Sequence, residues 1–139
     1  MKSRYEPLVK LKKKALDKAE QQLMNANTEV TVSDAVLLNA YAELSSLESP
    51  LNGAIGEFFQ AQMILQAQHR EIEACRMRVE RAHINQRAMR DAFKFARIEF
   101  EKFNYLELQE VEAMIKKVKY EEAKMLDEIG TMTYKKALL

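Results

Sequence analysis

The sequence predicts an all-α fold: a long antiparallel coiled-coil hairpin of two helices, with the second helix longer than the first. Three glycines and two prolines in 139 residues are too few for the turns of a compact globule. Apolar residues recur at alternating steps of three and four over most of the chain. This apolar pattern has one short interruption, which contains Pro50, Gly53 and Gly56. We therefore expect residues 1–139 to form a single coiled-coil domain.

The first helix is expected over about residues 3–48. Its apolar row forms a seam, the line of positions that a coiled-coil helix turns toward its partner, and only Ser33 in that row is polar. Residues 27–34 combine β-branched residues with poor helix formers, so whether they break the helix stays open. The seam consists of Leu16, Ala19, Leu23, Ala26, Val30, Ser33, Leu37, Ala40, Leu44, Leu47 and Leu51.

The turn is expected at about residues 49–55, where Ser49 provides an N-cap and Pro50 suits a first helical position. Two helices joined by so short a connection usually pack against each other in antiparallel orientation. Both helices rise by the same distance per residue on either side of a turn near residue 50. We therefore expect Leu44 to lie near Phe58 to Leu65.

The second helix is expected over about residues 55–136. At a rise of 1.5 Å per residue, the first helix spans roughly 70 Å and covers the second only to about residue 100. The rest must overhang, pair with another chain or lie against a partner. A five-residue step from Phe103 to Leu108 indicates a local unwinding between two apolar runs. The runs are Ile72, Cys75, Val79, Ala82, Gln86, Met89, Phe93, Ala96, Phe100 and Phe103, then Leu108, Val111, Ile115, Val118, Glu122, Met125, Ile129 and Met132.

Charge is distributed unevenly, although the net charge is only +1. Residues 1–18 carry seven Lys and Arg against Glu6 and Asp17, and residues 19–69 contain no Lys or Arg. A run of this kind is either a solvated face or a feature that steers partners. Around the turn, adjacent Phe58 and Phe59 project about 100° apart and cannot both enter one narrow seam. The turn therefore holds either a thickened core or an exposed apolar patch.

Residues suited to chemistry are scarce. Glu80 and His83 have the spacing of half a di-iron site, but the second half is missing, so we expect no metal, no cofactor and no catalytic residues. Cys75 falls in the seam, where a buried, inert thiol is expected. Lys10, Lys12, Lys13 and Lys14 raise the alternatives of a nucleic-acid or a membrane surface. The near-neutral charge favours a protein partner instead, with no nucleic acid and at most a peripheral membrane association. The scarcity of reactive residues indicates a binding or structural protein that is not an enzyme. No secretory or membrane-spanning segment is found in the sequence, which indicates a cytoplasmic protein.

The stretch YEPLVKLKKKALDKAEQQL, residues 5–23, resembles the opening of the FliJ family of flagellar type III export proteins. The matching positions are Tyr5, Leu8, Leu11, Lys12, Ala19 and Leu23. The resemblance implies a hairpin similar to the central stalk of rotary ATPases, located at the inner-membrane export apparatus. It also implies partners: the export ATPase hexamer, the export gate membrane protein and the export chaperones.

Two sets of partner-binding residues follow from this resemblance. The ATPase-binding set is Tyr5, Leu8, Lys10, Leu11, Lys12, Lys13 and Lys14. The gate-binding set near the turn is Tyr41, Phe58, Phe59, Leu65 and His69. The alternatives are a self-associating structural coiled coil, with residues 100–139 forming a homodimer, and a stalk subunit of another rotary ATPase or secretion system.

Overall fold

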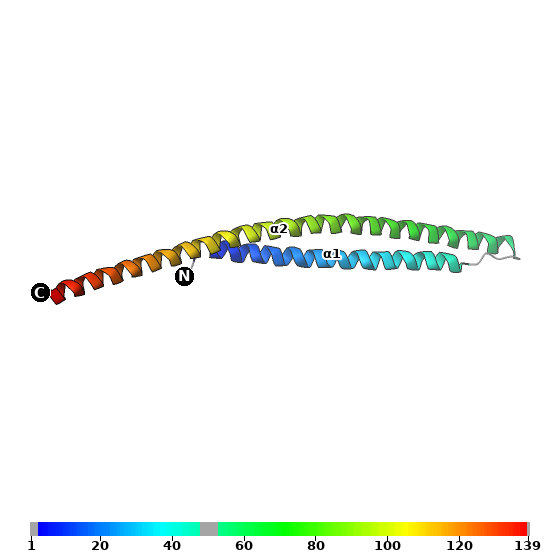
Figure 1. Cartoon of the computed structure of the whole chain (residues 1–139). Helices are drawn as coiled ribbons and strands as arrows, with labels where there is room; N and C mark the ends of the chain where they lie inside the picture. Colours follow the sequence, from blue (N-terminus) through cyan, green and yellow to red (C-terminus); the bar gives the residue numbers. More distant parts are fainter. Residues whose placement is uncertain (1–2, 48–52, 139) are drawn as a thin grey trace. The chain divides into compact units, whose positions relative to one another are not determined.

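The computed structural model describes residues 3–47 and 53–138, and it consists of two helices (Figure 1). Helix α1 is Glu6–Ser46 and helix α2 is Ile55–Leu138. The described residues contain no strand, and the contacts between the helices fit a hairpin with the longer helix second. The expected all-α hairpin is therefore confirmed. The expected N-cap at Ser49 and Pro50 lies outside the described residues.

Helix α1 begins with a side-chain cap. The backbone N–H of Tyr5 donates to Ser3 Oγ at 3.0 Å, and the N–H of Glu6 donates to the Ser3 carbonyl at 3.1 Å. These bonds satisfy donors that a helix start leaves without intrahelical partners. Glu6 also places a negative charge in the first turn, where the helix dipole favours it.

Residues 27–34, expected to be the weakest part of the first helix, do not break α1. The hydroxyls of Thr28 and Thr31 donate to the carbonyls of Met24 and Asn27, four residues earlier. Ser33 is fully buried, and its hydroxyl donates to the Val30 carbonyl at 3.1 Å. The three hydroxyl groups in this stretch are thus bonded back onto the helix instead of competing with it.

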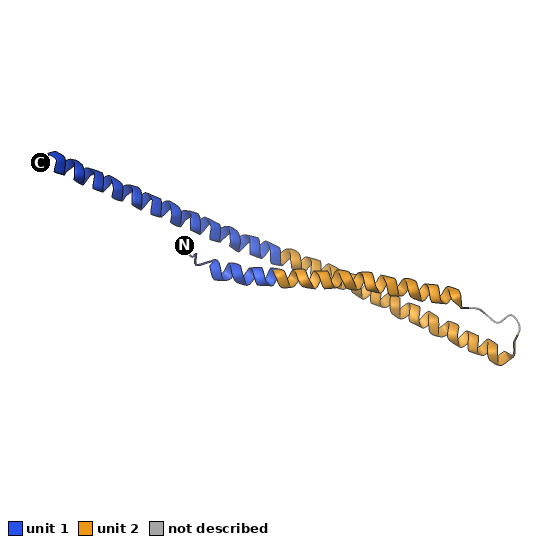
Figure 2. Ribbon diagram, turned by 90° about the horizontal axis from the view of Figure 1, so that it is seen from below, with its two compact units in different colours: residues 1–16, 96–139 blue, residues 17–95 orange. Residues whose placement is uncertain are grey.

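The chain divides into two compact units, each containing part of both helices (Figure 2). Unit 2 is residues 17–95, and its core follows the predicted seam. Along α1, small buried residues alternate with larger half-buried ones, as expected where knobs of one helix enter holes of the other. The buried residues are Ala19, Ala26, Ser33 and Ala40 on α1, and Ile72, Cys75 and Ala82 on α2.

The register in unit 2 is set by the side chain of Gln68. The side-chain amide of Gln68 donates to the Ala40 carbonyl at 2.9 Å and to the Glu43 carboxylate at 3.4 Å. Leu44, one residue after Glu43, therefore lies at about the level of Leu65, the far end of the range expected for it. Helix α1 ends at Ser46, only one or two turns beyond these bonds, and the start of α2 extends past it (Figure 1).

Unit 1 comprises residues 1–16 and 96–139. In it, the first turns of α1 lie against α2, with Leu16 and Ser3 buried. The expected seam position Leu108 is 57% exposed, whereas Leu106, Glu107, Glu110 and Val111 are half-buried. The burial of α2 thus does not shift to the predicted second run at Leu108. From Ile115 to Leu138 every residue is exposed, since α1 begins opposite an earlier part of α2.

Among the described residues, neither helix has a stretch that is apolar enough over a sufficient length to cross a membrane.

Candidate partner-binding surfaces

The basic N-terminal surface is formed by the first turns of α1 in unit 1. It is defined as Tyr5, Leu8, Lys10, Leu11, Lys12, Lys13 and Lys14. Leu8 and Leu11 are 40% and 59% exposed, so both leave apolar area in water. Lys10 pairs with Glu6 one turn earlier at 3.3 Å, an exposed pair that contributes little to stability. Lys14 is exposed as well.

Lys12 and Lys13 differ from the rest of this surface, because their ammonium groups contact side chains of α2. The Lys12 ammonium lies 3.5 Å from the Glu99 carboxylate and 5.5 Å from the centre of the Phe103 ring. The Lys13 ammonium similarly lies 5.6 Å from the Phe100 ring centre. Cation–π and charge contacts of this kind hold two helices together without an apolar knob. Lys12 and Lys13 therefore belong to the contact between the helices.

The tip surface lies in unit 2 and is defined as Tyr41, Phe58, Phe59, Leu65 and His69. Phe58 and Phe59 are 54% and 61% exposed, and their rings meet edge to face with centres 6.4 Å apart. Tyr41 and His69 are also exposed, and Leu65 is half-buried.

These five residues come from both helices and are spread along the hairpin. The bond from Gln68 to Ala40 brings Tyr41 and His69 to the same level of the hairpin. Phe58 and Phe59 lie ten or so residues earlier on α2, about 15 Å away along the helix axis. The structure thus places the expected residues along one end of unit 2, spread over about three turns.

An ion pair between the helices is the main feature of unit 2 that sequence reasoning missed. Arg78 donates to both carboxylate oxygens of Glu29, from Nε at 2.8 Å and from Nη2 at 3.2 Å. These hydrogen bonds lower the pKa of Glu29 and raise the pKa of Arg78. Nearby, the Gln86 amide donates to Asn27 at 2.7 Å. Both contacts join residues far apart in sequence, so they can be predicted only once the register of the two helices is known.

Cys75 is a buried seam residue, and its thiol donates to the Glu71 carboxylate at 3.7 Å. Burial, and after it the negative charge of Glu71, raises the pKa of the Cys75 thiol. The thiol therefore stays protonated at neutral pH, and a protonated thiol is a poor nucleophile and metal ligand. The described residues contain no group of His, Cys, Asp or Glu that could hold a metal ion.

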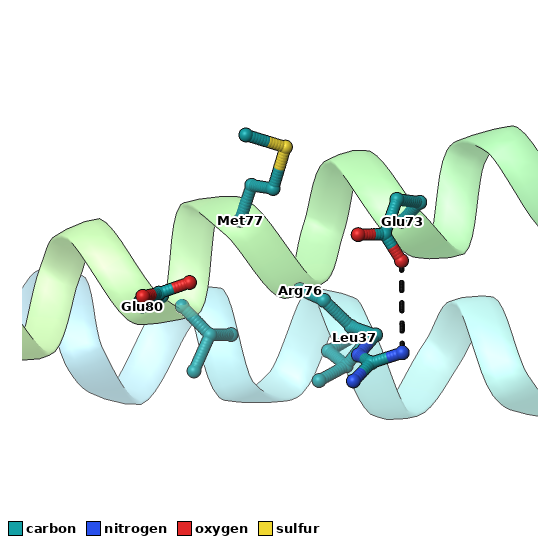
Figure 3. A pocket seen from close by; sticks show the side chains of 6 residues that line it. Leu37, Glu73, Arg76, Met77 and Glu80 are labelled. Atoms are coloured by element: carbon teal, nitrogen blue, oxygen red, sulfur yellow. Dashed lines mark ion pairs between the residues drawn. The ribbon is translucent and has the colours of Figure 1, made fainter.

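A shallow groove also opens on unit 2 (Figure 3). Leu37 of α1 lines it together with Glu73, Arg76, Met77, Val79 and Glu80 of α2. Arg76 pairs with Glu73 at 3.6 Å along its edge. Arg76 and Glu73 pair with each other, and the groove offers no converging set of donors for a small molecule.

A hairpin of two long helices belongs to the class of coiled-coil proteins. The model of one family, described as Flagellar FliJ protein, matches residues 1–138. The chain therefore belongs to the FliJ family, which confirms the resemblance seen in residues 5–23, and it is a stalk-like protein of flagellar export. Comparison with curated proteins and with solved structures gave no match.

Proposed function

We propose that this protein is a non-enzymatic adaptor that binds the export ATPase ring through the basic N-terminal surface and contacts the export gate through the tip surface. It also receives export chaperones, and it works in the cytoplasm at the inner-membrane export apparatus. The observation that supports this proposal is the difference between two exposed surfaces. The first is rich in lysine, and the second is aromatic and lies in a stretch of the chain without Lys or Arg.

The basic N-terminal surface suits a partner with acidic groups around an apolar contact. Leu8 and Leu11 supply the apolar area, and Lys10 and Lys14 supply exposed positive charge next to it. Complementary charge of this kind raises association rates and fixes orientation. Lys12 takes a different part, because its contacts with Glu99 and Phe103 position this stretch of α1 against α2.

The tip surface suits an apolar partner, because exposed aromatic side chains commonly carry most of the binding free energy of a small interface. Phe58 and Phe59 offer large side chains that the described part of the hairpin leaves open. Losing them should therefore weaken binding much more than it weakens folding.

The test replaces each surface separately and measures recovery of the ATPase and of the gate protein from a cell extract. The double variant Lys10→Glu and Lys14→Glu should lose the ATPase, and the loss should be stronger at low salt, where charge acts over longer distances. Phe58→Ala with Phe59→Ala should lose the gate and keep the ATPase. Lys116→Glu with Lys117→Glu controls for charge reversal elsewhere. If both surface variants recover both partners, the proposal is wrong.

Self-association through residues 100–139 is a second candidate, favoured by one observation. Apolar side chains from Ile115 onward, among them Met125, Ile129 and Met132, are exposed on α2. A contiguous apolar stripe is unfavourable in water and commonly marks an interface. Light scattering coupled to size-exclusion chromatography tests this candidate: a mass that doubles with concentration, and that Ile129→Glu returns to the monomer value, would support a homodimer.

A further inference from the structure

The seam of α2 continues beyond the end of α1. Counting back from buried Cys75 and Ile72 by alternating steps of three and four reaches Gln68, Leu65, Ala61 and Phe58. Gln68 bonds to Ala40 and Glu43, and α1 ends only three residues after Glu43. Since α1 runs antiparallel, its last turn reaches only to about residue 65 of α2. Residues 55–65, about 15 Å of helix, therefore present seam positions with no turn of α1 opposite them (Figure 1).

We call residues 55–65 the open seam. The exposure of their side chains agrees with the end of α1 near residue 65 of α2. Phe58, at an a or d position, is 54% exposed, whereas the next seam positions, Ala61 and Leu65, are half-buried and Ile72 is buried. Burial thus increases stepwise toward the part of α2 that α1 covers. A side chain at a seam position normally inserts between four residues of a facing helix, but α1 as described, Glu6–Ser46, offers Phe58 no such set of residues.

The charge around the open seam selects among occupants. Glu57 precedes Phe58, and Glu43 lies across from Gln68 near the end of α1. Residues 19–69 contain no Lys or Arg. If the tip of a second copy occupied the seam, Glu57 would face acidic groups with no Lys or Arg to compensate, which disfavours that pairing. An occupant with positive charge at the edges of its apolar row meets complementary charge instead.

We propose that residues 55–65 of α2 bind a short amphipathic helix of a partner protein, which continues the coiled coil beyond α1 and carries Lys or Arg beside its apolar row. Phe58 is the central contact, Leu65 extends the apolar row toward α1, and Glu57 and Glu43 attract the basic flanks. The inference rests on the proposed function only in taking this end of unit 2 as a binding surface; it adds the secondary structure and the charge of what binds there.

The test uses the full chain and a stapled helical peptide of about fourteen residues, with Leu at its seam positions and Lys on both flanks. Peptide binding is measured by fluorescence anisotropy. A second peptide replaces each Lys with Glu, and a third replaces each Leu with Ser. The Leu–Lys peptide should bind, its affinity should fall as salt rises, and both other peptides should bind at least about tenfold more weakly.

Two variants of the chain then locate the peptide. Phe58→Ser should weaken binding about tenfold or more, as expected for the loss of a central aromatic contact. Ile64→Ser is the matched control, because Ile64 is 55% exposed on the same turns but lies off the seam, and it should change the affinity less than about twofold. Circular dichroism should show the same helix content for both variants.

Several outcomes would overturn the inference. Equal affinity for the Lys and Glu peptides would show that the occupant is not selected by its charge. Equal weakening of binding by Phe58→Ser and Ile64→Ser would show that the peptide does not bind along the seam. A mass that rises with concentration and that Phe58→Ser returns to the monomer value would identify a second copy as the occupant. A large gain in peptide affinity on Leu47→Ser would show that the chain's own connection fills the seam.

The same variants separate this inference from the proposed function. If the gate protein is recovered with wild type and lost with Phe58→Ser, while the Leu–Lys peptide does not bind, the proposed gate contact stands and the basic-helix occupant is wrong. If the peptide binds as expected and the gate protein is recovered with both variants, the open seam serves a different partner.

Discussion

Units 2 and 1 hold the same two helices together by different means (Figure 2). In unit 2, buried Ala26, Ala40 and Ala82 allow close approach, and Ile72 fills the seam between them. In unit 1, the contacts near the start of α1 are mostly charged: Arg4 with Glu110 at 3.4 Å and Lys12 with Glu99 at 3.5 Å. Apolar burial is insensitive to salt, whereas exposed ion pairs are weak and screened. Unit 2 should therefore supply stability, and the start of α1 in unit 1 should be the part that opens first.

The largest expected effect is on the seam of unit 2. Ile72→Ala removes a side chain that is only 6% exposed and leaves a gap beside Ala40 and Cys75. The free energy of unfolding should fall by about 2–4 kcal/mol, measured by urea denaturation followed by circular dichroism. Ile84→Ala is the matched control on the same helix, and its exposed side chain should contribute less than about 0.5 kcal/mol. Similar losses for the two variants would contradict an apolar seam in unit 2.

An intermediate effect is expected from salt on unit 1. Raising the salt concentration from about 0.01 M to about 1 M shortens the Debye length from about 30 Å to about 3 Å. Each exposed ion pair contributes about 0.2–1 kcal/mol, so amide hydrogen exchange in residues 6–16 should accelerate about two- to tenfold. Exchange in residues 19–40 should hardly change.

The salt effect has its own matched pair of variants. Glu110→Gln removes the ion pair with Arg4 and should reduce the salt dependence of residues 6–16, whereas Glu112→Gln, an exposed neighbour, should leave it unchanged. Exchange that accelerates equally in both units would show that the comparison between them is wrong.

The smallest expected effect concerns pH in unit 2. The hydrogen bonds from Arg78 lower the pKa of Glu29 below its ordinary value of 4.5. A folded-state pKa below the unfolded one gives stability that is present above the unfolded pKa and lost as the pH falls through the folded pKa. Glu29→Gln should therefore lower the melting temperature slightly at neutral pH, and its difference from wild type should shrink below about pH 4.5. Glu20→Gln, on the same helix, controls for the loss of one charge, and a difference that persists in acid would contradict the assignment.

The heptad pattern was sufficient to predict the fold and most of the seam, because burial of one face of a long helix repeats regularly from Ala19 to Leu44. It did not reveal Lys12 as a contact residue. Counting back from Leu16 by four does reach Lys12, but a charged residue is not recognised as a seam position without knowing that Glu99 and Phe103 face it.

The heptad pattern alone could not fix the register, and with it the open seam, for a physical reason. A shift of one helix by seven residues leaves every apolar position in the same place in the pattern, so heptads cannot choose between such registers. Polar pairs such as Arg78 with Glu29 and Gln68 with Ala40 make the choice, and they are recognisable only in three dimensions. Exposure of Phe58 depends directly on that choice.

The stretch without Lys or Arg also determines which reagents can report on this protein. Trypsin cleaves after Lys and Arg, so it cannot cut between Lys18 and Arg70, however exposed the backbone there is. A complete tryptic digest leaves residues 19–70 as one fragment that contains most of α1, the connection and the start of α2. Amine-reactive crosslinkers likewise find no lysine in that fragment. A partner held at the tip would therefore leave no lysine crosslink and no tryptic footprint within residues 19–69, and carboxylate-directed or photoactivated reagents are needed to detect it there.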